Sequence, residues 1–170
     1  MYKKNGFTLL ELLVVVLIIG VLTAIAVPQY QYTVYKARYL QMVVLVDSIV
    51  RAQENHFLAT GEYTMDLDAL DITLPSGETS GTASRRNYKN YSIYILGDIH
   101  QVAIGHMQTG ASDWDLNYYH YYKRIDTGAK WRPECRCSPE GPTHESCRVC
   151  AKVGAVYGSS NASYSIYYFY

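Results

Sequence analysis

The chain has 170 residues, with 15 basic and 15 acidic side chains and a formal net charge of zero. This length fits a single domain, and a chain so nearly neutral has no general attraction for nucleic acid. The sequence contains no glycine-rich phosphate loop, no G-x-S-x-G and no H-E-x-x-H, and its five histidines are scattered. Those motifs carry phosphate binding, acyl transfer and zinc-dependent hydrolysis, so we expect no enzyme and no cofactor.

The first predicted element is an apolar helix that contains one charge. Residues 7–27 include no charged side chain except Glu11. At 1.5 Å per residue this run spans roughly 30 Å as a helix, about the thickness of the hydrocarbon layer of a bilayer. An ionised carboxylate in that layer costs on the order of 3 kcal/mol. Glu11 is therefore a candidate functional residue that needs a partner, and an amine on another copy of the chain is the obvious candidate.

The residues before this run distinguish it from a secretory signal. Residues 1–6 are short and basic, which predicts that this end of the chain stays in the cytoplasm. A secretory signal has a shorter apolar core followed by small residues, whereas here the processing signal is Gly6-Phe7, ahead of the run. The segment resembles the amino terminus of the type IV pilin and pseudopilin family. The matching positions are Lys3, Lys4, Gly6, Phe7, Thr8, Leu9, Glu11 and the apolar stretch that ends at Pro28.

The resemblance implies how the chain is processed and assembled. A prepilin peptidase would cut after Gly6, where glycine lets the backbone enter a protease cleft without a side-chain clash, and would methylate the new amino group of Phe7. Cleavage removes two lysines, which leaves 13 basic side chains (15 − 2) against 15 acidic ones. In a filament the amine of one subunit would neutralise Glu11 of a neighbour, because two charges too costly to bury singly are tolerated as a pair. The alternative is a plain signal-anchor helix with a tolerated Glu11 near its cytoplasmic end.

The helix is expected to continue well beyond the apolar run. Pro28 predicts a kink, and residues 29–58 contain no further proline and no glycine. Apolar residues recur there at helical spacing, so we predict one helix from residue 7 to about residue 58, ended by Thr60-Gly61. Its two parts would be a transmembrane or filament-core part (residues 7–28) and an amphipathic part (residues 29–60). A connecting loop with a short helical turn would follow (residues 61–90).

The rest of the chain (residues 91–170) predicts a small head. Segments 91–96, 100–107 and 118–125 are rich in β-branched and aromatic residues, and segment 164–170 is a further strand candidate. We expect an antiparallel sheet packed on the second half of the helix, which makes an α+β fold and, by the family resemblance, a pilin-like one. The 18 tyrosines are interpreted as sheet packing and an amphipathic outer face.

Four cysteines lie within residues 135–150, as Cys135-Arg-Cys137 and Cys147-Arg-Val-Cys150. Beyond the cytoplasmic membrane, an even number of cysteines predicts disulfides. Cys135 and Cys137 are too close for an easy mutual bridge, which favours cross-pairing with the other two. The same spacing also suits a zinc site of four thiolates, and the Cys147-x-x-Cys150 pair suits a redox role.

Three functions stay open from the sequence. The resemblance implies a structural subunit of a type IV pilus or, on the same helix, a pseudopilin of a type II secretion system. The third function is that of a membrane-anchored metal-binding or redox domain that uses the four cysteines. For a pilin, the implied partners are other copies of the chain, a prepilin peptidase and an inner-membrane assembly platform, and not nucleic acid. The implied location is the inner membrane, as a single-pass protein, and then a cell-surface or periplasm-spanning filament.

Overall fold

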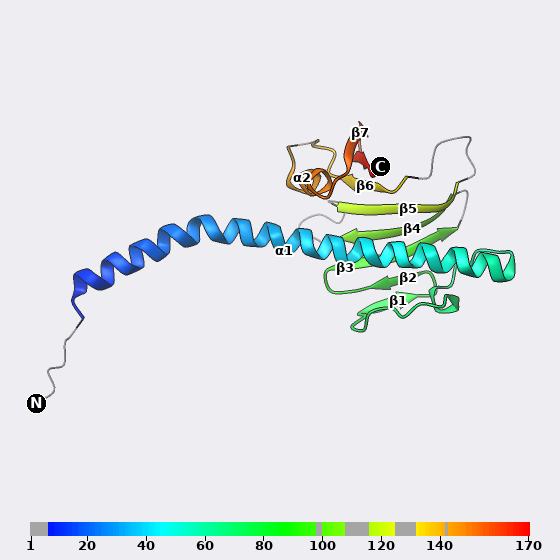
Figure 1. Ribbon diagram of the computed structural model, residues 1–170, viewed down its shortest axis with the longest axis horizontal. Helices are drawn as coiled ribbons and strands as arrows, with labels where there is room; N and C mark the ends of the chain where they lie inside the picture. Colours follow the sequence, from blue (N-terminus) through cyan, green and yellow to red (C-terminus); the bar gives the residue numbers. More distant parts are fainter. Residues whose placement is uncertain (1–6, 98–99, 108–115, 125–131, 142) are drawn as a thin grey trace, which may run out of the picture. The chain divides into compact units, whose positions relative to one another are not determined.

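The computed structural model describes residues 7–97, 100–107, 116–124, 132–141 and 143–170 (Figure 1). The chain divides between Ala37 and Arg38 into two compact units. The elements in chain order are α1 (Leu9–Thr60), η1 (Leu67–Ala69), β1 (Ser80–Thr82), β2 (Arg85–Asn87), β3 (Tyr91–Gly97), β4 (His100–Met107), β5 (Leu116–Arg124), β6 (Glu134–Cys137), α2 (Glu145–Lys152), β7 (Val156–Ser160) and β8 (Ser165–Tyr168).

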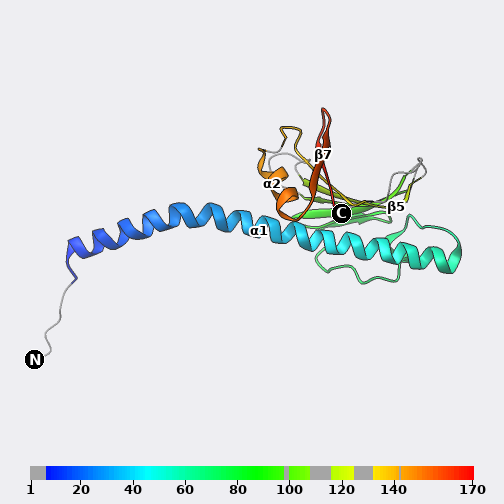
Figure 2. The same ribbon diagram turned by 45° about the horizontal axis from the view of Figure 1, so that its top comes forward.

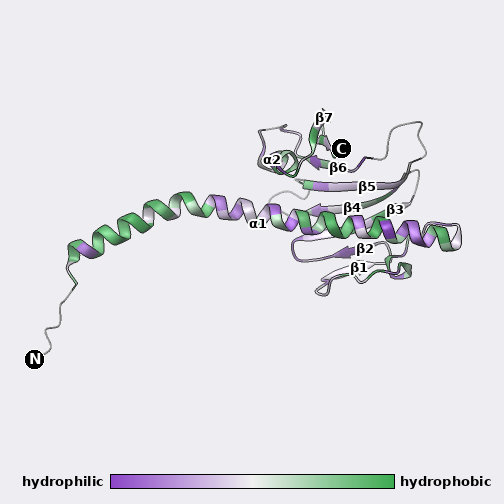
Figure 3. Cartoon of the chain, in the orientation of Figure 1, coloured by the Kyte–Doolittle hydropathy of each residue, from purple (hydrophilic) through white to green (hydrophobic). Residues whose placement is uncertain are grey.

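The first unit contains the apolar part of α1. Figure 3 shows this part of the helix as hydrophobic over nearly its whole length. Its large apolar side chains are exposed along its whole length; Phe7 at its start is 74% exposed and Val27 near its end is 49% exposed. By length and composition α1 is able to cross a membrane. A helix that is apolar all round requires an apolar environment, which comes from lipid or from other protein.

The second unit is built on an eight-stranded antiparallel sheet with the strand order β1-β2-β3-β4-β5-β6-β8-β7. The strands from β1 to β6 lie side by side in chain order. The chain then passes through α2 and forms β7 at the edge of the sheet, and β8 returns to lie between β6 and β7 (Figures 1 and 2). This return places the last strand against β6, which carries two of the four cysteines.

The second half of α1 packs on one face of this sheet (Figure 2). Tyr39 and Met42 of the helix are fully buried, and the Tyr39 ring meets the edge of the Tyr118 ring of β5 at a centroid distance of 6.5 Å. Gly105 of β4 permits a close approach, because a Cβ atom there would lie 2.6 Å from the Cγ atom of Met42. The predicted α+β architecture, a long helix on a small antiparallel sheet, is confirmed.

Polar contacts fix the register of the helix on the sheet. A carboxylate oxygen of Asp47 accepts a hydrogen bond from the Tyr118 hydroxyl at 2.8 Å and lies 2.7 Å from Nδ1 of His120. Near the end of α1, the fully buried Gln53 side chain binds the backbone of Thr64 through its nitrogen (2.7 Å) and its oxygen (3.2 Å). Because both amide groups of Gln53 are satisfied, its burial is tolerated.

The segment expected as a connecting loop with a short helical turn (residues 61–90) contains that turn as η1. It also contains β1 and β2, so the expectation that the rest is a loop is corrected. Bonds from Arg86 of β2 hold this segment in a defined structure. Its guanidinium group is largely buried and lies 2.6 Å from the Asp68 carboxylate and 3.3 Å from the Glu78 carboxylate, and it also donates to the carbonyl oxygen of Thr82. These bonds tie β2 to η1 and to the residues before β1. The sheet therefore begins at Ser80 and not at residue 91.

Candidate functional site

The carboxylate of Glu11 closes a capping box at the amino end of α1. Thr8 precedes the first helical residue, and its hydroxyl accepts a hydrogen bond from the Glu11 amide at 3.2 Å. In return, the Glu11 carboxylate accepts bonds from the Thr8 amide at 2.8 Å and from the Thr8 hydroxyl at 2.7 Å. This is the reciprocal pattern in which a threonine and a glutamate three residues later satisfy free amides of the first helical turn.

The surroundings of this carboxylate are apolar and open. Leu9 is 86% exposed and Leu10 is 72% exposed in the single chain. Glu11 is the only charged side chain between residues 7 and 27, so lipid or a neighbouring chain that covers this helix also covers the carboxylate. Such a cover removes water from Glu11, and the bonds from Thr8 carry no compensating charge. A cationic partner would supply that charge.

The predicted cleavage site lies at the edge of the described chain. Phe7 is described and its side chain is 74% exposed. Gly6, the two lysines and the remainder of the predicted leader (residues 1–6) lie outside the described residues. Cleavage after Gly6 and methylation of Phe7 therefore stay predictions.

Pro28 lies inside α1, which continues through it to Thr60. Proline has no amide hydrogen, so the carbonyl group of Ala24 loses its helical donor at this point. The helical assignment on both sides shows that neighbouring turns tolerate this loss. A kink at Pro28 stays a prediction.

The cysteines form two disulfides that join α2 to β6. Cys135 is bonded to Cys150, with Cα atoms 5.7 Å apart, and Cys137 is bonded to Cys147, with Cα atoms 5.1 Å apart. All four residues are fully buried. None of them is a free thiol, and the described residues contain no group of three or more His, Cys, Asp or Glu side chains able to hold a metal ion.

Comparisons with known proteins agree with the amino-terminal motif. A family model described as the prokaryotic N-terminal methylation motif matches residues 1–27. A fimbrial protein of Pseudomonas aeruginosa is 37% identical over 82 residues, which are 48% of this chain and 53% of that protein. A type IV major pilin protein of Neisseria gonorrhoeae, PilE1, is 28% identical over 78 residues, 46% of this chain and 47% of that protein. In its amino-terminal half the chain is thus similar to type IV pilins and fimbrial proteins, and it carries their methylation motif.

The similarity to these relatives is partial. The fimbrial protein EcpB of Eikenella corrodens is 42% identical over 66 residues, which are 39% of this chain and 42% of that protein. The chain thus spans about half the length of the relatives it matches. No solved structure matches it significantly. The relatives are named as fimbrial proteins and pilins, not as enzymes.

One residue of this site was missed by the sequence reading. Thr8 was noted only as a family position, although Thr8, Glu11 and the apolar run behind them have the spacing of a capping box. This spacing is visible in the sequence, but the partner expected for Glu11 was an amine on another copy of the chain and not a residue of its own first turn.

Proposed function

We propose that this chain is the structural subunit of a type IV pilus-like filament, cut after Gly6, methylated at Phe7 and assembled through α1. One observation carries the proposal. The first unit is a helix with an exposed apolar surface, and its single carboxylate lies one turn from the predicted new amino terminus. Packing of such helices against one another covers the apolar surface, and the amine of Phe7 in one copy supplies the cation that Glu11 of another copy lacks.

The proposed location follows from the same segment. Before assembly α1 anchors the chain in the inner membrane with the basic residues 1–6 in the cytoplasm, where a prepilin peptidase meets Gly6-Phe7. An assembly platform in that membrane then transfers the helix from lipid into the filament. The partners in the filament are further copies of the chain.

The disulfides favour a pilus over a type II secretion pseudopilus. The segment after β5 is held by two buried bridges, each worth about 2–4 kcal/mol in a small head. Such bridges persist in oxidising surroundings and suit a filament exposed to proteases outside the cell. A metal-binding or redox domain has less support, because the four sulfur atoms are bonded in pairs and buried.

Two measurements on the natural protein test the proposal. Mass spectrometry of filament subunits should find N-methylated phenylalanine, Phe7, as the first residue. Met1 retained on assembled subunits would contradict the processing step. Glu11→Ala should still insert into the membrane, since a charge leaves the hydrocarbon, and should lose most filaments, because a buried cation left without its partner costs about 3–5 kcal/mol.

A matched control separates this effect from a general loss of helix charge. Glu54 is an exposed glutamate on the same helix, and Glu54→Ala should leave the filament yield close to that of the parent chain. A normal yield from Glu11→Ala would rule out the pairing with Phe7.

A further inference from the structure

The sheet has two free edges, and one of them is protected. β1 lies at the first edge and has only three residues. The Glu78 carboxylate lies directly over Gly81 in the middle of β1, where it would overlap any larger side chain, and Arg86 holds it there. Short length and a charge on the edge are two devices by which proteins prevent a sheet from pairing with another chain.

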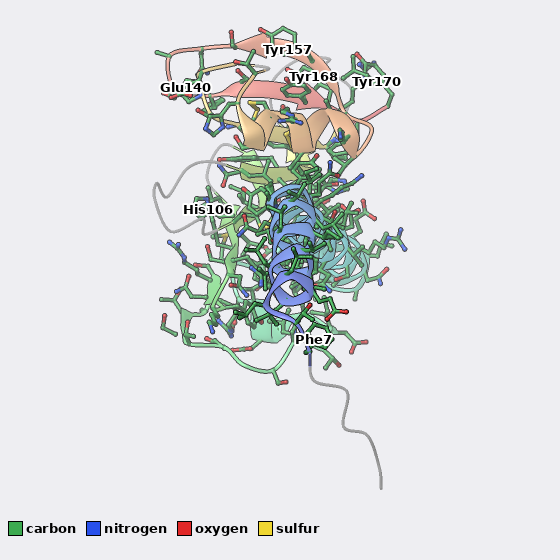
Figure 4. All side chains as sticks on the ribbon, turned by 90° about the vertical axis from the view of Figure 1, so that its left-hand side faces the viewer. Phe7, His106, Glu140, Tyr157, Tyr168 and Tyr170 are labelled. Atoms are coloured by element: carbon green, nitrogen blue, oxygen red, sulfur yellow. A yellow bond between two sulfur atoms is a disulfide. The ribbon has the colours of Figure 1, made fainter. Side chains whose placement is uncertain are left out.

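The other edge has little such protection. All five residues of β7 are exposed, with Val156 at 54% and Tyr157 at 47%, and β8 is the only described strand that pairs with β7. Residues 153–170 contain no charged side chain. Figure 4 shows Tyr157 and Tyr168 at the outer end of the second unit. The single device present is an irregularity between Tyr157 and Ser159, where Gly158 is the extra residue.

We infer that β7 of one copy pairs antiparallel with β7 of a second copy, so that two sheets join edge to edge. The free amides and carbonyls of an edge strand are matched by another extended strand. In an antiparallel self-pair centred on Gly158, Val156 faces Ser160 of the other copy and no charge opposes a like charge. An uncharged edge is thus complementary to itself. Pairing at β1 would remove the charges around it from water, which disfavours pairing at that edge.

The symmetry of this contact determines what it joins. A contact between identical edges closes after two copies, so it does not extend a filament. It links two filaments side by side, and in this respect it rests on the proposed function. The ladder is short and interrupted at Gly158, so one pair of heads associates weakly. Filaments repeat the edge many times, and repeated weak contacts add up to strong association.

Charge placement on β7 tests this pairing in assembled filaments. Wild-type filaments should associate laterally in electron micrographs and sediment at low speed. Val156→Lys together with Ser160→Lys places lysine opposite lysine and should lower the sedimented fraction by roughly tenfold or more, because multivalent association contributes a gain on the order of 10²–10⁴ that is then lost. Val156→Lys together with Ser160→Glu places opposite charges face to face and should retain association. Thr73→Lys together with Ser76→Lys adds the same charge at exposed positions away from β7 and should behave as wild type.

Each other outcome overturns a defined statement. Single wild-type filaments, equal dispersal by the two lysine pairs, or dispersal by the lysine–glutamate pair would each refute the β7 pairing while leaving the filament itself intact. Absence of any filament would contradict the proposed function instead. In that case the weak dimer of the purified full chain in detergent decides the pairing, measured over a series of rising protein concentrations. The two lysines on β7 must lower the dimer fraction at each concentration, and the lysine–glutamate pair must not.

Discussion

The Glu11 carboxylate has one role in the single chain, where it caps α1 together with Thr8, and a second role in the proposed filament. In the single chain the carboxylate accepts hydrogen bonds from the amide and the hydroxyl of Thr8, which fixes the first turn of α1. In the proposed filament the same carboxylate also meets the amine of a neighbouring copy. A carboxylate has two oxygens and about four acceptor positions, so Glu11 has room to accept bonds from Thr8 and from the amine at the same time.

Replacement of Thr8 by valine tests the first of these uses alone. Thr8→Val keeps the shape of the side chain but removes the hydroxyl, so the first turn of α1 should lose about 0.5–2 kcal/mol. Hydrogen exchange of the amides of residues 9–12 in the detergent-solubilised chain should then become severalfold faster. Thr23→Val is the matched control, because the Thr23 hydroxyl bonds to carbonyl groups inside the helix and caps nothing. Unchanged exchange in Thr8→Val would contradict the capping box.

At the scale of elements, the disulfides hold a short helix to a short strand. α2 has eight residues and β6 has four, so neither is long enough to be stable by itself. Two residues that are two positions apart on a strand lie on the same face of the strand. Two residues that are three positions apart on a helix lie on the same face of the helix. Cys135 and Cys137 therefore project together from β6, and Cys147 and Cys150 project together from α2. Both bonds form when these two faces meet.

Removal of one bridge at a time measures what this connection contributes. Cys137→Ala with Cys147→Ala should lower the free energy of unfolding of the head by about 2–4 kcal/mol, and Cys135→Ala with Cys150→Ala by a similar amount. Limited proteolysis of the full chain should then cut within residues 132–170 first and leave α1 intact. Cleavage no faster than in the parent chain would show that packing alone holds α2 in place.

The elements differ in how far the sequence predicted them. α1 was predicted because its apolar pattern is long, and the strands that became β3, β4 and β5 because β-branched and aromatic residues are concentrated there. β1 and β2 were missed because each has three mostly polar residues, and the bonds from Arg86 to Asp68 and Glu78 that fix them follow no strand pattern in the sequence. β6 and α2 were hidden among the cysteines. Spacing favoured cross-pairing, but the two cross-pairings differ only in three-dimensional geometry.

For the site, the sequence identified Glu11 because a single charge within an apolar run is costly to bury without a partner. It did not identify the acceptor role of Asp47, which joins α1 to β5 through Tyr118 and His120. Asp47 lies 71 positions from Tyr118 and 73 from His120, and no local pattern relates it to them. Contacts of this kind depend on how the helix lies on the sheet, which local propensities do not determine.

At the scale of the whole head, the tyrosines form part of two apolar layers. Ile104 of β4 is 2% exposed although it lies on the face of the sheet opposite Gly105 and α1. Its cross-strand neighbours are Tyr94 of β3 and Tyr119 of β5. The cations of Arg85 and Arg136 lie over these two rings, at 5.2 and 3.8 Å from the centroids. Large rings beside a smaller residue thus bury the central strand on its outer face, as the amphipathic interpretation of the tyrosines expected.

This arrangement predicts how the stability of the head depends on alkaline pH. Burial, with a contribution from Tyr119, raises the pKa of Tyr94 to about 12, and burial also raises the pKa of Tyr118 and Tyr122. An unfolded tyrosine has a pKa of about 10, so the folded head holds these protons more tightly than the unfolded chain does. Their contribution to stability is fully present below about pH 10 and is lost as the pH rises from there to 12 and beyond.

Tyr94→Phe isolates the contribution of one of these groups. The variant keeps the ring over Ile104 but has no proton to lose, so its free energy of unfolding should fall less steeply than that of the parent chain between about pH 10 and 12. Denaturant titrations of the full chain in detergent at a series of pH values measure this slope. Tyr30→Phe, a change at an exposed tyrosine of α1 (71% exposed), should leave the slope as it is in the parent chain. A parent-like slope in Tyr94→Phe would mean that the outer tyrosines are hydrated in the folded head, and the apolar layer over β4 would then have to come from other side chains.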